Sequence, residues 1–158
     1  MSLVIETSSG RRQLTPSRIA RLSEQFIAEP AYQHVGMNLV GISYGHCTAE
    51  VPINCSLLHH RGAVQGGILA MIADATAGYA ALAVVEDDEP AADMATLEFK
   101  TSFFEPAVGR TLRCRADALR TSRHIVFCRA LVWSHSADGN ELLCAEATLT
   151  FKRLGGVR

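Results

Sequence analysis

One acidic residue stands alone within the longest apolar stretch of the chain. Between residues 64 and 85, Asp74 is the only charged residue, and the other polar side chains are Gln65, Thr76 and the hydroxyl of Tyr79. Buried carboxylates are rare unless they are paired, and they often mark functional sites. Asp74 can act as a nucleophile or as a general base, and the sequence does not choose between these roles. The alternative is a structural carboxylate that caps a neighbouring group.

A pair of glycines, Gly66 and Gly67, stands where this stretch is expected to start as a helix. The first N–H groups of a helix have no partner within it, and they carry the positive end of the helix dipole. Because glycine has no side chain, a reacting group can approach these amides closely. They are therefore candidate donors to a developing oxyanion, with a plain turn or packing role as the alternative.

The spacing of these groups predicts an assembly of two chains. Gly66 and Asp74 are eight residues apart in the sequence, which is roughly 12 Å along one helix. Both must lie about 3 Å from the reacting group, so a single helix cannot easily supply both. Two antiparallel helices related by a two-fold axis near Ala70 can do so, and the small residues Gly67 and Ala73 would also allow close approach. We predict a homodimer with two sites across its interface.

This apolar stretch is long enough to span a bilayer. It is rich in alanine and glycine rather than leucine, however, and its centre holds a carboxylate, which hydrocarbon disfavours by about 3 kcal/mol. We therefore expect a helix buried in a protein core rather than a membrane span.

The residues before this central helix predict one helix and two strands. A Thr15 cap and Pro16 at the first position predict a helix that ends before Pro30. Residues 35–44 are a weaker strand candidate because glycines interrupt them, and residues 46–53 alternate as a strand with one buried face.

From the end of the central helix onward, the pattern is all strand. Alternating side chains predict strands near 93–103, 112–118, 123–134 and 141–153, with a hairpin turn at 136–140. An antiparallel sheet wrapped around the central helix satisfies this order of elements, because the helix needs cover on most of its sides. The sequence therefore predicts an α+β architecture.

The composition is that of one ordinary domain. The chain has 158 residues, of which 48% are apolar, and we expect a flexible segment at 1–14 followed by a single domain over 15–158. A net charge of −1 argues against a general nucleic-acid binder. Five scattered cysteines form no CxxC pair and no zinc spacing. With no secretory signal, they predict reduced thiols, no metal site and a cytoplasmic location.

The segment around the glycine pair resembles a known family. Its residues are His59-His60-Arg61-Gly62-Ala63-Val64-Gln65-Gly66-Gly67, and Asp74 follows seven residues later in Ala73-Asp74. They resemble the signature Asn-x-x-Gly-x-x-His-Gly-Gly of hotdog-fold thioesterases of the phenylacetyl-CoA thioesterase type. The resemblance continues through 96–99 and 104–107 and covers about residues 35–153. It implies a hotdog fold and an acyl-CoA thioesterase that acts on a small, medium-chain or aromatic acyl group.

Two residues depart from the family pattern, and a third matches it. His59 stands at the usual asparagine and Gln65 at the usual histidine. Both side chains can donate a hydrogen bond to a carbonyl oxygen, but Gln65 cannot titrate. Thr96 matches a family position where a hydroxyl helps to place the water or the carboxylate. The alternatives are a loop residue for His59, a helix-start residue for Gln65 and a strand residue for Thr96.

The resemblance also implies coenzyme A as the carrier of the acyl group, with no separate cofactor. Arg120, Ser122 and Arg123 lie between two predicted strands and are candidates to meet the nucleotide phosphates, with His60 as a further contact. Solvated turn charges are the alternative. We expect self-association as a homodimer that pairs into a dimer of dimers, with no nucleic-acid or membrane partner.

Two other functions on the same fold stay open. A non-catalytic acyl-CoA-binding or sensing protein is favoured by Gln65 and His59, which replace the usual family residues. A dehydratase would need a catalytic histidine beside a carboxylate, and the central helix offers no histidine. The fold alone does not decide among these functions.

Overall fold

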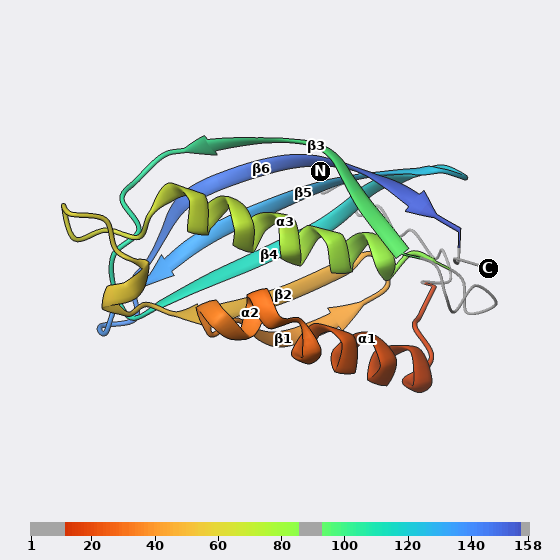
Figure 1. The fold of residues 1–158 in the computed structure, drawn as a ribbon, viewed down its shortest axis with the longest axis horizontal. Coiled ribbons are helices and arrows are strands. Elements are labelled where there is room, and N and C mark those ends of the chain that lie inside the picture. The colour runs from red at the N-terminus through yellow and green to blue at the C-terminus, as the bar shows by residue number, and fades with distance from the viewer. Residues whose placement is uncertain (1–11, 86–92, 156–158) are drawn as a thin grey trace, which may run out of the picture.

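In the computed structural model, which describes residues 12–85 and 93–155, an antiparallel sheet curves around one long helix (Figure 1). The spatial order of its six strands is β1-β2-β4-β5-β6-β3, so the first strand after the long helix forms one edge. The predicted architecture is confirmed. The strands are β1 (Asn38–Ser43), β2 (His46–Pro52), β3 (Asp93–Phe103), β4 (Thr111–Thr121), β5 (Ile125–His135) and β6 (Glu141–Leu154).

The helices are α1 (Pro16–Ala28), α2 (Pro30–Val35) and the long α3 (Gly66–Leu82), with a short 3-10 helix, η1 (Cys55–Leu57), before α3. The predicted cap of α1 is confirmed, because the Thr15 side chain accepts a hydrogen bond from the Arg18 amide at 3.2 Å. Among the described residues, no helix combines the length and the apolar character that crossing a bilayer requires.

The second helix, α2, was not predicted from the sequence. Pro30 was expected only to end the first helix, but it also occupies the first position of the second, where its fixed φ and missing N–H suit a helix start. Glu29 alone separates the two helices, in an extended conformation. Gly36 then ends α2 with a φ of 71°, a left-handed conformation that glycine adopts readily. The predicted weak strand therefore begins only at Asn38.

The core lies between α3 and the concave face of the sheet. Alternate residues of β4, β5 and β6 point toward α3 and are buried. On the helix, Ile72, Ala73, Ala77 and Ala80 are fully buried. The small alanines allow α3 to lie close to the sheet, and the packing of this face explains the apolar stretch in the sequence.

The two edges of the sheet differ in their cover. β1 has a register shift between Leu39 and Gly41, and α1 packs against it. β3 is longer, and none of the described strands pairs with its outer side. Its phenylalanines are exposed in a single chain, Phe99 by 47% and Phe103 by 55%. A long edge strand with exposed apolar side chains favours association with another chain, because its unpaired backbone groups can form hydrogen bonds with that chain.

One prediction falls partly outside the described residues. The flexible segment at 1–14 cannot be compared with the structure over residues 1–11. The hairpin turn at 136–140 is confirmed, since the Ser136 amide donates to the Asn140 carbonyl at 3.0 Å.

Candidate active site

Asp74 and Thr96 meet although they come from different elements. Thr96 of β3 donates a hydrogen bond from its hydroxyl to Oδ1 of Asp74 on α3, at 2.8 Å. No hydrogen bond among the described residues reaches Oδ2 of this carboxylate. The contact therefore fixes one oxygen and leaves the other for a water molecule or a substrate.

A β-bulge turns Thr96 toward the helix. The sequence predicted that Leu97 shares a face with Phe99, because residues two apart on a regular strand point the same way. In the structure the pairing with β6 shifts between Thr96 and Glu98. Thr96 pairs with the buried Phe151, so Thr96 and Phe99 lie on the helix side and Leu97 is the extra residue. The predicted alternation is wrong at this point, and the bulge is what completes the contact.

The environment of Asp74 changes its acidity in a defined direction. Burial raises the pKa of the Asp74 carboxyl above its usual range, and the hydrogen bond from Thr96 lowers the pKa by a smaller amount. The ionised carboxylate is consequently a stronger base than an exposed aspartate. This property suits a group that must accept a proton or attack a carbonyl carbon.

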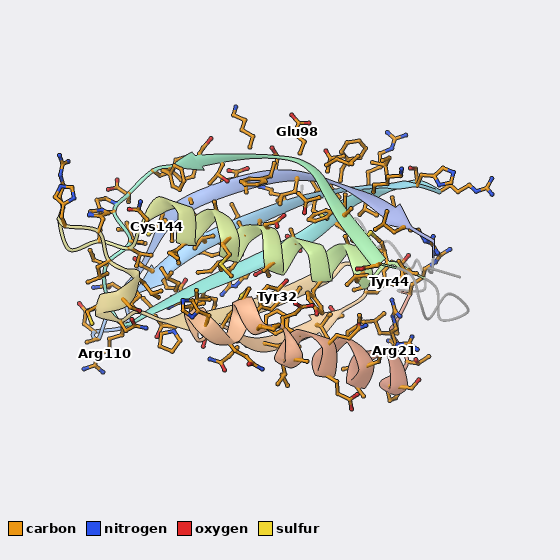
Figure 2. All side chains as sticks on the ribbon, in the orientation of Figure 1. Arg21, Tyr32, Tyr44, Glu98, Arg110 and Cys144 are labelled. Atoms are coloured by element: carbon orange, nitrogen blue, oxygen red, sulfur yellow. The ribbon has the colours of Figure 1, made fainter. Side chains whose placement is uncertain are left out.

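A cavity of about 760 Å³ lies beside this pair and extends over the half-exposed face of α3. Figure 1 shows α3 between β3 on one side and α1 with α2 on the other, and the cavity has walls from all of these elements. In Figure 2 the side chain of Tyr32 lies between α2 and α3. The lining residues are Gln25, Ala28, Glu29, Pro30, Tyr32, Asp74, Ala75, Gly78, Tyr79, Leu82, Asp93, Met94, Thr96 and Phe151.

The predicted oxyanion donors lie at the start of α3, away from this cavity. Gln65 precedes the helix and makes no capping hydrogen bond with its side chain, and neither Gly66 nor Gly67 lines the cavity. A side chain at Gly66 would contact the ring of Phe103 at 3.4 Å, whereas one at Gly67 would meet nothing within 4 Å. Packing within one chain therefore gives no reason for glycine at position 67.

His59 and His60 lie in the loop before α3. The Gly62 amide donates to the His59 carbonyl at 2.9 Å, and Nδ1 of His59 accepts from the Arg61 amide at 3.0 Å. The rings of His59 and His60 lie 5.8 Å apart. Neither histidine lines the cavity beside Asp74, so one chain does not bring them to the carboxylate.

The candidate phosphate contacts lie at the hairpin between β4 and β5. Arg120 and Arg123 are exposed there. Ser122 shapes the turn, because its hydroxyl donates to the Ile125 carbonyl and accepts from the Ile125 amide, each at 3.1 Å. None of these three residues lines the cavity.

Several lining residues were not found from the sequence. Glu29 and Tyr32 come from the junction of α1 and α2, and Asp93 comes from the first position of β3. The Glu29-Pro30 pair could have signalled a second helix start, since proline is favoured at that position. The contact of this junction with α3 depends on tertiary packing, which the sequence pattern does not contain.

The donor set does not favour a metal. Among the described residues, no group of three or more histidine, cysteine, aspartate or glutamate side chains is placed to hold an ion. The cysteines of the described segments are unpaired thiols, of which Cys55 is exposed and the others are buried.

The chain resembles known proteins in sequence and in structure. Residues 61–139 match the family model of the thioesterase superfamily. A thioesterase family protein from Silicibacter pomeroyi has a TM-score of 0.83 and 26% identity, over 88% of this chain and 99% of that chain. The PaaI protein of E. coli, from the phenylacetic acid degradation operon, shares the fold at a TM-score of 0.76 and 13% identity, over 89% and 96% of the two chains. A Saccharolobus solfataricus protein, named provisionally as an esterase, is 25% identical over 99 residues, which are 63% of this chain and 68% of that protein.

These matches confirm the expected hotdog architecture. The range that matches the family model includes the whole of α3 and the whole of β3. Asp74 and Thr96 therefore both lie within the part of the chain that carries the family match.

Proposed function

The chain belongs to the thioesterase superfamily, and from this we propose that it hydrolyses acyl-CoA to the free acid and coenzyme A. The acyl group is small, of medium length or aromatic. The observation that supports this most is the Asp74 carboxylate, which is held by Thr96 and opens into a cavity of about 760 Å³. A pocket of this size, with a few polar groups and a carboxyl of perturbed pKa, has the properties of a small-molecule site.

Two reaction routes use the same carboxylate. As a general base, Asp74 takes a proton from a water molecule while the water oxygen attacks the thioester carbon. The tetrahedral intermediate then collapses, the C–S bond breaks, and the thiolate takes up the proton. As a nucleophile, an Asp74 oxygen attacks the same carbon and expels the thiolate, and water then cleaves the mixed anhydride to the free acid and the carboxylate. Both routes require Asp74 to be ionised.

The carbonyl oxygen gains negative charge in both routes and needs hydrogen-bond donors. The amides of Gly66 and Gly67 are suitable, because the first N–H groups of a helix have no partner within it. They do not line the cavity of their own chain, so we propose that a second copy supplies them. The uncovered edge of β3 supports this pairing, as do the exposed rings of Phe99 and Phe103 beside it.

The remaining predicted residues have secondary roles in this proposal. Gln65 and His59 lie near the start of α3 and are candidates to donate to the substrate carbonyl from the second copy. Arg120 and Arg123, with His60, are candidates for the phosphates of coenzyme A, whereas Ser122 holds the hairpin that carries the arginines.

We also propose that two dimers associate through the outer face of the sheet. Leu119 of β4 and Phe127 of β5 are exposed, by 61% and 47%, and they line a hollow of about 370 Å³ on that face. Exposed apolar patches on a sheet often mark contacts between subunits.

A turnover screen tests the proposed function. Straight-chain and aromatic acyl-CoAs are incubated with the protein, and the release of the free thiol is followed. We expect turnover of at least one member of the set and loss of turnover in the Asp74→Asn variant. If no acyl-CoA is hydrolysed, or if the variant keeps full activity, the proposal is wrong. Thermal stabilisation by acyl-CoA without turnover would instead support the non-catalytic binding function, which the untitratable Gln65 favours.

A further inference from the structure

The wall of the cavity opposite β3 comes from the junction of α1 and α2. Glu29 is the one residue between these helices, and its backbone serves both of them. Its amide donates to the Phe26 carbonyl, and its carbonyl accepts from the amides of Tyr32 and Gln33. Its side chain makes no capping hydrogen bond to α2. Glu29 lines the cavity.

Contacts from side chains of α1 and α2 hold this wall against α3. Arg18 of α1 is buried and donates from its guanidinium to the Leu82 carbonyl in the last turn of α3, at 3.1 Å. The ring of Phe26 packs against those of Tyr32 and Tyr79, with centroid distances of 5.0 and 4.9 Å. The Glu29 backbone is therefore carried on a packed unit beside the cavity.

The charged residues that the structure describes around the cavity are all acidic. They are Glu29, Asp74 and Asp93, and no lysine, arginine or histidine among the described residues lines the cavity. Burial and then the charges of Glu29 and Asp74 raise the pKa of the Tyr32 phenol. The pKa of Tyr79 is raised in the same direction, first by burial and then by Tyr32 and Glu29. Both phenols stay protonated, so they add no negative charge to the cavity.

We propose that Glu29 is a specificity-determining residue that makes this cavity accept acyl groups with an uncharged end and reject acyl groups that end in a carboxylate. This inference rests on the proposed thioesterase function, because it takes the cavity beside Asp74 as the place of the acyl group. A terminal carboxylate in the cavity meets like charges and leaves its hydration shell without gaining a cationic partner. An uncharged tail of the same shape loses much less hydration and meets no repulsion from the acidic lining residues.

A matched pair of substrates isolates the charge. Glutaryl-CoA and its terminal amide, glutaramoyl-CoA, have nearly the same shape and differ by one negative charge on the acyl tail. We expect the wild-type protein to prefer the amide by at least about tenfold in kcat/KM, and the preference to shrink at high salt because exposed charges are screened. In Glu29→Gln we expect the preference to fall by at least about threefold, with kcat/KM for the amide within about twofold of wild type.

Glu24→Gln is the control variant. Glu24 is an exposed acid of α1 that does not line the cavity, so its replacement changes the net charge equally and should leave the preference unchanged. Equal kcat/KM values for the two substrates, or an unchanged preference in Glu29→Gln, would overturn the role of Glu29 while the thioesterase function stands. If the wild-type protein hydrolyses neither these substrates nor any other acyl-CoA, the proposed function fails, and this inference fails with it.

Discussion

The two faces of α3 are built from similar small residues but under different constraints. The face toward the sheet includes Ile72, Ala73 and Ala77, which are fully buried. The other face is only partly covered in a single chain. Its residues recur every three or four positions, and they are Gly67, Ala70, Met71, Asp74, Gly78 and Leu82.

Packing of the fold accounts for the small residues on the sheet face of α3 but not for those on its other face. On the sheet face, close packing explains each alanine. On the other face, a side chain at Gly67 would meet nothing within 4 Å, and one at Gly78 would meet the Phe151 ring at an ordinary 3.6 Å. A glycine within a helix costs about 0.5–1 kcal/mol relative to alanine. The chain accepts this cost, and a half-buried carboxylate, on the partly covered face of α3, as functional sites commonly do.

The largest expected effect is the loss of activity in Asp74→Asn. Removal of the base or nucleophile should lower kcat by about 10²–10⁴-fold. The fold should not suffer, because the raised pKa means that folding disfavours the ionised carboxylate. The variant should therefore unfold at a temperature equal to or above that of wild type at neutral pH. The difference should vanish as the pH falls through the pKa of Asp74, where the wild-type carboxyl is also neutral. Thermal melts at several pH values check this, and a strongly destabilised variant at neutral pH would contradict it.

A substitution on the sheet face of α3 should have the opposite result, a loss of stability with little change in activity. Ile72→Ala should lower the free energy of unfolding by about 2–5 kcal/mol, because it leaves a cavity in the core. Its kcat at a temperature where the variant stays folded should remain near that of wild type. Denaturant unfolding and turnover assays measure the two quantities separately. A loss of kcat as large as that of Asp74→Asn would remove the distinction between the two faces.

Gly67→Ala should lower activity by less than Asp74→Asn does, and it should not lower stability. The added methyl group has free space in a single chain, and alanine favours the helix, so stability should be unchanged or slightly higher. If a thioester must approach the amide, kcat/KM should fall by about tenfold, because a displacement of about 1 Å at a site can cost more than this. A variant with wild-type kcat/KM would show that no reacting group approaches Gly67.

Thr96→Val should give the smallest change, a shift in pH dependence. The hydrogen bond from Thr96 lowers the pKa of Asp74, so its removal should raise that pKa further. Because the ionised form is the active one, activity is lost as the pH falls, and the acidic limb of the pH–rate profile should move to higher pH. Thr96→Ser keeps the hydroxyl and should restore the wild-type profile. A limb that stays in place in Thr96→Val would exclude this role.

The sequence predicted the architecture well because its signals are local. The Thr15-Pro16 start of α1 and the alternation of β4 to β6 depend on neighbouring residues, and both are confirmed. The solitary charge of Asp74 in an apolar helix was also visible. Thr96 was named by family resemblance, whereas strict alternation would have turned it away from the helix. Only the bulge in β3, which depends on the pairing with β6, brings it to Asp74.

Other expectations were wrong or incomplete for a related reason. Ala73 was expected to help two helices approach, but it is fully buried against the sheet, because a shift of one position on a helix changes the face by about 100°. Glu29 and Tyr32 were missed because their place beside Asp74 depends on how α1 and α2 pack over α3. Contacts between distant elements carry no periodic signal in the sequence.

The most direct measurement is the activity of mixed dimers. Asp74→Asn removes the carboxylate, and Gly67→Val places a bulky side chain over the proposed amide donors. Each variant alone should be nearly inactive. If each site combines Asp74 of one chain with the amides of the other, a mixed dimer has one intact site. Random pairing of equal amounts should then restore about one quarter of the wild-type activity. A mixture no more active than its two parents would contradict the shared site.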